Sequence, residues 1–331
     1  MGVEISPPKL QKRPLGSQHF KIRVLTHKAL ASAGAFFFSL CYNIHEHLCG
    51  GYTMKITPIA QISPGQDGAI WGDFLFRFDH LGHCWVHHWR SWELISEFTL
   101  DKADRICPHS NAVVFGCYFY APGDEFPLLY TNIYNNYAKA EDPHKGVCCV
   151  YRLTREGNHF TTHLVQMIVI GFTENTGLWC SPEGDIRPYG NFVVDRKTGR
   201  YWAFVMRDGC HQTRYFSFDL PAVTAGEIDA ELDIPRYVLT EQEIIDTFDV
   251  PYHHFIQGAC LHNGKIWSVE GFTDDMGNPP GLRIIDPVAR HQELYVNFMD
   301  MGICEEAEFI DFVDDTCYYS DAEGKLYTLE I

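Results

Sequence analysis

Residues 66–76 read QDGAIWGDFLF: a polar pair, small residues, apolar residues, a tight Gly-Asp turn and an aromatic-rich run. The same order recurs without gaps at 257–267, QGACLHNGKIW, and at 308–318, EFIDFVDDTCY. Residues 191–202 repeat it with one extra turn residue, and 109–115 open another copy whose second strand would be 127–133. Recurrence of one pattern along a chain indicates a repeat fold.

Each copy is followed by further short, strand-like runs separated by Gly, Asp, Asn and Pro. The third strands are expected at 147–153, 215–220, 282–287 and 326–331. The sequence therefore predicts an all-β propeller of four-stranded antiparallel blades, each with its first strand near the central axis. Starts near 66, 109, 191, 257 and 308 favour five blades. Six is the alternative, because the interval from 109 to 191 is long, although 171–189 reads as a loop.

Two segments complete this arrangement. Residues 56–62 are expected to form an outer strand that closes the ring against the last blade and leaves no open edge. Only 240–248 looks helical: Thr240 and Glu243 match a capping box, and Ile244, Ile245 and Phe248 fall on one helical face.

The first 53 residues differ from the rest, with six Lys or Arg and two Glu, followed by an apolar run at 29–40. A basic stretch before a short apolar run is the outline of a secretory signal or anchor. The alternatives are a poorly ordered stretch, or a spurious one preceding a true start at Met54. We therefore expect a basic leader at 1–54 and a single propeller domain at 55–331.

Charge and cysteine usage limit the functional class. The formal net charge of −17 disfavours binding to nucleic acid, and the chain has no apolar run of about 18 residues to span a membrane. The 12 cysteines include no C-x-x-C, and several lie in hydrophobic runs. These features predict reduced, buried thiols and an acidic, monomeric protein. They favour a cytoplasmic location, or export if the leader is a real signal.

Several of these motifs resemble one family. Residues 66–68 with 71–73, 109–112 with 115–116, and the Phe-Pro-Leu-Leu-Tyr element at 126–130 are similar to uncharacterised bacterial β-propellers. Those proteins are grouped with TolB-like or amine-dehydrogenase-like propellers. The resemblance covers about residues 55–331 and implies the propeller fold, but it supplies no activity.

In a propeller, the first strands bring polar residues from every blade to one axial position. The catalytic candidates are Asp67, Glu306 and Glu308, with His253 and Glu305 beside them. The ligand-binding candidates are Gln66, His109, Asn111, Asn191, His254 and Gln257. Among these, His109 and His254 are also candidate ligands for a divalent metal, the one cofactor that the residue types allow. The alternative is that these residues line a water-filled channel and only satisfy backbone groups.

Two functions remain open at this stage. The first is a propeller that binds a small polar ligand or a protein partner at its axial face. The alternative is a carbohydrate-active hydrolase or lyase, or a glutaminyl-cyclase-like enzyme, since residues 255–258 and the strands after them are similar to plant-type glutaminyl cyclases. Glycoside hydrolysis requires two carboxylates about 5–5.5 or 6.5–9.5 Å apart. Convergence of Asp67, His109, His254 and Glu306 in a closed pocket would favour the enzyme.

Overall fold

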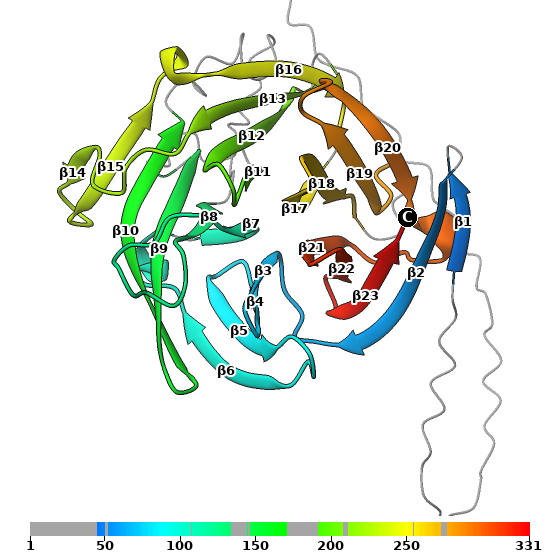
Figure 1. The fold of residues 1–331 in the computed structure, drawn as a ribbon, viewed down its shortest axis with the longest axis horizontal. Helices are drawn as coiled ribbons and strands as arrows, with labels where there is room; N and C mark the ends of the chain where they lie inside the picture. Colours follow the sequence, from blue (N-terminus) through cyan, green and yellow to red (C-terminus); the bar gives the residue numbers. More distant parts are fainter. Residues whose placement is uncertain are drawn as a thin grey trace, which may run out of the picture. The chain divides into compact units, whose positions relative to one another are not determined.

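The computed structural model describes residues 45–331 except 50, 51, 107, 134–143, 145, 171–190, 208–210, 254 and 273–276. Within one compact unit, Tyr42–Ile331, it shows five sheets arranged radially about a common centre, antiparallel except where β10 pairs with β15 (Figure 1). The chain is therefore a five-bladed propeller, and the six-bladed alternative is excluded. The leader expected at 1–54 falls outside the described residues as far as residue 44.

Each blade has four strands, counted from the axis outward. Blade 1 consists of β3 (Gly68–Trp71), β4 (Phe74–Phe78), β5 (His83–His88) and β6 (Leu94–Thr99). Blade 2 consists of β7 (Pro108–Phe115), β8 (Leu129–Ile133), β9 (Val147–Glu156) and β10 (His159–Ile170). Blade 3 consists of β11 (Asn191–Val194), β12 (Arg200–Arg207), β13 (Gln212–Asp219) and β16 (Asp246–Pro251).

Blade 4 consists of β17 (Ile256–His262), β18 (Lys265–Glu270), β19 (Gly281–Asp286) and β20 (His291–Asn297). Blade 5 consists of β21 (Ala307–Val313), β22 (Thr316–Asp321), β23 (Lys325–Glu330) and β2 (Tyr52–Gln61). The five inner strands begin where the sequence repeat places them, so the repeat register is confirmed.

Blade 5 joins the two ends of the propeller sequence. Strand β2 pairs antiparallel with β23, with Lys55 opposite Glu330, and β1 (His45–Cys49) pairs with the outer side of β2. The expected closing strand is therefore confirmed, and it begins earlier than predicted. Met54, which we assigned to the leader, lies in β2 and is buried against the core of blades 4 and 5.

One excursion interrupts blade 3. After β13 the chain forms β14 (Glu227–Asp229) and β15 (Ile234–Leu239), and β15 pairs parallel with β10 of blade 2 before β16 returns to β13. The helix expected at 240–248 is wrong. The capping box is present, but it starts only the 3-10 turn Glu241–Glu243. Pairing of β16 with β13 buries Phe248 and leaves Ile245 half exposed, which an extended strand allows.

The core is divided among the interfaces between blades. The described residues form five hydrophobic clusters, and each lies between neighbouring blades. Between blades 1 and 2, Phe76 packs edge-on against Phe115, Phe126 and Phe160 with ring centroids 5.4, 5.7 and 5.5 Å apart. Because both faces of a blade are covered, inner strands such as Asn191–Val194 are buried throughout.

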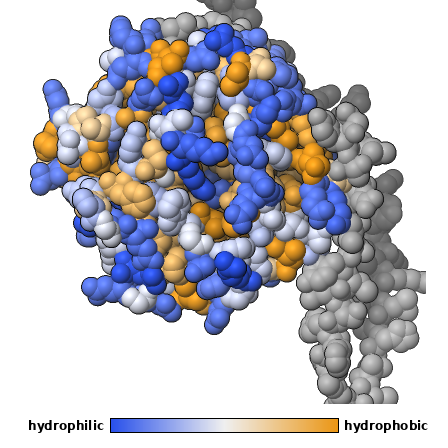
Figure 2. All heavy atoms as spheres, in the orientation of Figure 1, coloured by the Kyte–Doolittle hydropathy of each residue, from blue (hydrophilic) through white to orange (hydrophobic). Residues whose placement is uncertain are grey.

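The remaining short elements lie in connections: α1 (Ala103–Ile106) before blade 2 and η4 (Phe298–Met301) before blade 5. None of the helices in the described part of the chain has the length and apolar character needed to cross a bilayer. Figure 2 shows one face of the molecule, with hydrophilic residues over its centre and hydrophobic residues in separate patches. The described cysteines outside any disulfide are five buried ones, Cys84, Cys148, Cys149, Cys260 and Cys317, together with the half-buried Cys117 and the exposed Cys304.

Candidate functional site

The candidate site lies where the five inner strands begin, which we call the strand-start end of the axis; their other ends form the strand-exit end. Figure 1 shows β3, β7, β11, β17 and β21 around the centre of the ring. The residues just before or at the start of each strand carry the predicted polar side chains, so the fold brings residues far apart in the sequence to one end of the molecule.

Two glutamines from different blades bind carboxylates of blade 5. Gln66 donates from Nε2 to Glu308 Oε1 at 2.9 Å, and Gln257 donates from Nε2 to Glu306 Oε1 at 2.6 Å. Gln66 and Glu306 are half-buried, whereas Glu308 is fully buried and Glu305 is exposed. The described strand-start end thus presents an acidic surface, formed by Glu305 and Glu306, above a buried carboxyl group.

Below this surface lies a cluster of charged groups that the sequence analysis only partly identified. Asp67, Glu308 and Arg77 are each 0% exposed. Arg77 Nη2 donates to the backbone oxygens of Gly65 at 2.7 Å and Asp321 at 3.1 Å, and its charge interacts with Glu308. Burial lowers the pKa of Arg77 to about 10 and raises the pKa of Asp67 and of Glu308 well above their ordinary values. The two carboxyl groups therefore hold their protons to higher pH than exposed ones do.

Asp67 links three blades instead of facing an open channel. Its Oδ2 accepts a hydrogen bond from the backbone N–H of Val113 in blade 2 at 2.8 Å. Its Oδ1 lies against Gly258 of blade 4, where a Cβ atom would come within 2.6 Å of that oxygen and 2.3 Å of the Glu308 carbonyl oxygen. Strands of blades 1, 4 and 5 therefore meet at this level, and only glycine fits at position 258.

Asn191 makes an equivalent link between blades 2, 3 and 4. It is buried, and its Nδ2 donates to the backbone oxygens of Asn111 at 3.0 Å and Gln257 at 2.6 Å. The Asn111 side-chain oxygen in turn accepts a hydrogen bond from Asn132. Of the predicted ligand-binding residues, Asn191, Asn111 and Gln257 thus bind one another or a glutamate across blade boundaries.

The two candidate histidines that the structure describes, His109 and His253, have separate surroundings. His109 is half-buried, and burial together with the nearby His80 lowers its pKa to about 4, so it is neutral at pH 7. His253 is fully buried between blades 3 and 4, with Nδ1 3.5 Å from Tyr215 Oη and 3.9 Å from Glu270 Oε2. His254 lies outside the described residues. Across the ranges that the structure describes, no three His, Cys, Asp or Glu side chains are grouped to hold a metal ion.

Two buried charged residues were missed because they lie within strands and not at their starts. Arg77 lies in the aromatic strand β4. Asp311, in β21, accepts hydrogen bonds at Oδ2 from Ile70 N at 2.8 Å and from Arg196 Nη2 at 3.0 Å, which joins blades 5, 1 and 3. A charged residue inside an otherwise apolar strand was the available signal in both cases, since such a residue requires a buried partner.

Comparisons with known proteins add nothing finer than the fold that the strand order itself defines. No family model matches the chain, and no curated protein matches it. Among solved structures, glutaminyl cyclase from Myxococcus xanthus is similar with a TM-score of 0.46 and 8% identity, over 83% of this chain and 95% of that one. The class is thus a five-bladed β-propeller, defined by its own strand order. No family is assigned by sequence.

Proposed function

We propose that the strand-start end binds a small polar ligand that carries hydrogen-bond donors, with a protonated amine as the defining group. The observation that supports this is the pair of neighbouring glutamates at the strand-start end, Glu305 exposed and Glu306 half-buried, with Glu306 hydrogen-bonded to Gln257. Ionised carboxylates only accept hydrogen bonds, and the charge of Glu306 is close enough to raise the pKa of Glu308. A cationic donor would relieve this repulsion.

Arg77, the cation of the buried cluster, already donates hydrogen bonds to backbone oxygens, which strengthens the case for a cationic ligand. Arg77 is buried below Glu306 and donates to two backbone oxygens. Burial raises the pKa of Glu306 while its hydrogen bond from Gln257 lowers it. A bound ammonium group would favour the ionised form of Glu306, so ligand binding is expected to release a proton near the raised pKa.

The test is calorimetric titration of the full chain with spermidine and glycinamide, with glycerol as the neutral comparison. Glu306→Gln keeps the size and removes the charge, and it should weaken amine binding about tenfold, the worth of one charge-assisted hydrogen bond. Glu227→Gln on the exposed strand β14 makes the same charge change far from the axis and should bind like the unaltered chain. Absence of amine binding, or equal loss in both variants, would contradict the proposal.

A second candidate is an enzyme: a carbohydrate-active hydrolase or lyase, or a glutaminyl-cyclase-like enzyme. One observation favours it. Glu306 is half-buried, and burial raises its pKa, as is typical of a carboxyl that acts as a general acid. The resemblance to TolB-like or amine-dehydrogenase-like propellers adds no activity. Assays with nitrophenyl glycosides and with a peptide that begins with glutamine decide the matter: turnover that Glu306→Gln abolishes supports the enzyme, and no turnover on either substrate removes these two activities.

A further inference from the structure

Asn191, at the start of β11, lies next to a residue that binds the proposed amine site. Its side chain is buried, and its Nδ2 group donates to two backbone oxygens, that of Asn111 at 3.0 Å and that of Gln257 at 2.6 Å. A carboxamide nitrogen carries two N–H groups, so it can serve both oxygens at once, which an ionised carboxylate cannot do. Asn191 therefore holds the main chain of blade 4 from the neighbouring blade 3.

Gln257 lies in a β-bulge. The pairing of β17 with β18 shifts register between Ile256 and Ala259, so that Gln257 and Gly258 face a single residue of β18. A bulge interrupts the regular ladder and can turn a side chain in a new direction. The position of Gln257 then depends on contacts outside the ladder, and the bond from Asn191 to its backbone oxygen is such a contact.

Gln257 in turn orients the carboxylate of Glu306. The Glu306 main chain is fixed within blade 5, because its backbone oxygen accepts from the Ala322 N–H at 2.9 Å. Its side chain is half-buried and accepts at Oε1 from Gln257 Nε2 at 2.6 Å. Burial raises the pKa of Glu306, and this hydrogen bond opposes the rise. The ionised form of Glu306, which a protonated amine would bind, thus depends on where the Gln257 carboxamide is held.

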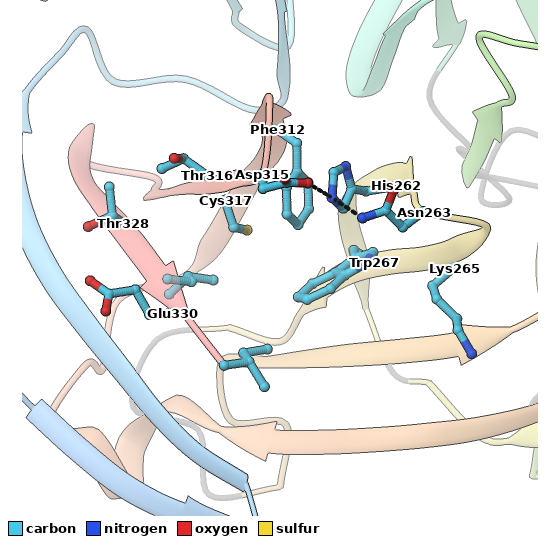
Figure 3. A pocket seen from close by; sticks show the side chains of 12 residues that line it. His262, Asn263, Lys265, Trp267, Phe312, Asp315, Thr316, Cys317, Thr328 and Glu330 are labelled. Carbon is cyan, nitrogen blue, oxygen red and sulfur yellow. Dashed lines mark hydrogen bonds and ion pairs between the residues drawn. The ribbon is translucent and has the colours of Figure 1, made fainter.

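Blades 4 and 5 are also joined at the strand-exit end, where Figure 3 shows His262 of β17 beside Phe312 of β21. The two rings stack with centroids 3.8 Å apart and planes 1° apart, and Trp267 meets Phe312 edge-on at 4.9 Å. These contacts do not involve Asn191 or Gln257. Loss of the Asn191 hydrogen bond is therefore expected to release the Gln257 side chain while the two blades stay together.

We propose that Asn191 is a positioning residue of the amine site, which holds Gln257 in the place from which its carboxamide binds Glu306. The inference rests on the proposed function, since the site that Asn191 serves is the one assigned there to a protonated amine. Without the bond from Asn191, Gln257 donates to Glu306 less of the time, and Glu306 keeps its proton to higher pH. Amine binding, which needs the ionised carboxylate, then begins at higher pH.

The experiment follows Glu306 directly, by NMR titration of the full chain with isotope-labelled glutamate carboxyls, in which Glu306→Gln identifies the signal. Asn191→Ala should raise the proton affinity of Glu306 about threefold or more, a part of the worth of a hydrogen bond to a charged group. Gln257→Met keeps the length of the side chain, removes its donor and should raise the proton affinity at least as much. In both variants, spermidine binding measured by calorimetry should shift to higher pH.

Gln166→Ala is the matched control. Gln166 is a buried carboxamide in β10, the fourth strand of blade 2 from the axis, and its Nε2 donates to the backbone oxygens of Ala222 at 2.8 Å and Ala225 at 3.0 Å. Its loss should lower stability in urea much as Asn191→Ala does, and should leave the proton affinity of Glu306 unchanged. Should Asn191→Ala fail to fold, Asn191→Ser decides. Serine keeps one hydroxyl donor, so a smaller rise of about twofold is expected.

A double variant tests whether Asn191 acts through Gln257. Asn191→Ala combined with Gln257→Met should raise the proton affinity of Glu306 no further than Gln257→Met alone, because residues of one hydrogen-bond network are not additive. A rise in the Asn191 variant that is absent from Gln166→Ala supports the proposal.

Three results overturn the role of Asn191. The proton affinity of Glu306 is unchanged in the Asn191 variant, it rises equally in Gln166→Ala, or the double variant shows the sum of the two single shifts. Absence of spermidine binding to the unaltered chain contradicts the proposed function and not the link from Asn191 to Glu306. An unchanged Glu306 titration with intact spermidine binding contradicts only the role of Asn191.

Discussion

Neighbouring blades are joined by different kinds of contact at the two ends of the inner strands. At the strand-start end, Asp67 and Asn191 join neighbouring blades through hydrogen bonds. At the strand-exit end, aromatic rings cover the seams, as where the half-buried Trp92 packs on the buried Tyr318 with centroids 5.6 Å apart. Buried charge makes the first end sensitive to proton binding, whereas aromatic packing does not titrate. We therefore expect pH to act on the cluster of Asp67, Glu308 and Arg77, and not on the contact between Trp92 and Tyr318.

The largest effect should come from removing the buried cation at the strand-start end. Arg77→Met removes the buried charge that offsets Glu308, Asp67 and Asp321 when they ionise, and breaking such a buried pair costs about 3–5 kcal/mol. Urea unfolding followed by tryptophan fluorescence measures the loss. Arg90→Met, at a site where the side chain is 67% exposed, is the control and should change stability by less than about 0.5 kcal/mol. Similar losses in both variants would remove the contrast between the ends.

A smaller loss should follow when the link between blades 1 and 2 is cut. Asp67→Ala leaves the Val113 N–H buried without an acceptor, which costs about 1–3 kcal/mol. Asp67→Asn keeps an acceptor oxygen and should cost less, since burial already raises the pKa of Asp67 toward the neutral form. The two variants are compared by the same unfolding measurement. A greater loss for Asn than for Ala would mean that the charge, not the hydrogen bond, is what matters.

The dependence of stability on pH should be determined by a group at the strand-start end, Glu308. Burial raises the pKa of Glu308, so the folded chain keeps this proton to higher pH than the unfolded chain does. The corresponding stability is present below the unfolded pKa and is lost as pH rises through the folded pKa. The loss is about 1.4 kcal/mol for each tenfold difference in proton affinity between the folded and the unfolded chain.

Glu308→Gln cannot lose that proton and keeps an acceptor for Gln66. The free energy of unfolding of Glu308→Gln, relative to that of the unaltered chain, should therefore increase as pH rises above about 4.3. Unfolding curves at several pH values test this. Parallel pH profiles for the two proteins would show that Glu308 is not the group responsible.

The smallest effect is expected at the strand-exit end. Trp92→Leu removes the ring that packs on Trp89 and Tyr318 and should cost about 0.5–1.5 kcal/mol. Because no charge is involved, the loss should be the same at pH 5 and pH 8. A loss that varies across this range would contradict the division between a titrating end and an aromatic end.

The repeat explains how much of the fold was readable from the sequence. An inner strand needs small residues where blades converge and a tight turn where it reverses, and both are local patterns. The turn at Asn263 and Gly264, with φ of 49° and 75°, is one such signal. The closing strand was equally visible, because an apolar run before the first repeat has no other partner.

Contacts between distant strands were not readable in the same way. Asp311 serves the Ile70 N–H and Arg196, and Gly258 makes room for Asp67, but neither pairing leaves a local pattern. The helix predicted at 240–248 is wrong for a related reason. Its capping box is present, but pairing with β13 outweighs the local helical preference. The predicted residues at the strand starts that the structure describes lie at one end of the axis, with His253 buried between blades 3 and 4. Burial, which the sequence did not reveal, decides which of them can meet a ligand.

The pairing of β2 with β23 also determines when the last sheet can form as the chain is synthesised. Lys55 and Glu330, which meet in this pair, are separated by 275 positions. The earliest strand of the ring must therefore wait, unpaired along that side, while four other sheets are made. A ribosome stalled before residue 325 would hold a chain whose β2 lacks its neighbour, and such an unpaired edge is prone to association with other chains. Completion of the last sheet, and not of the first four, then marks the point at which a nascent chain becomes safe from aggregation.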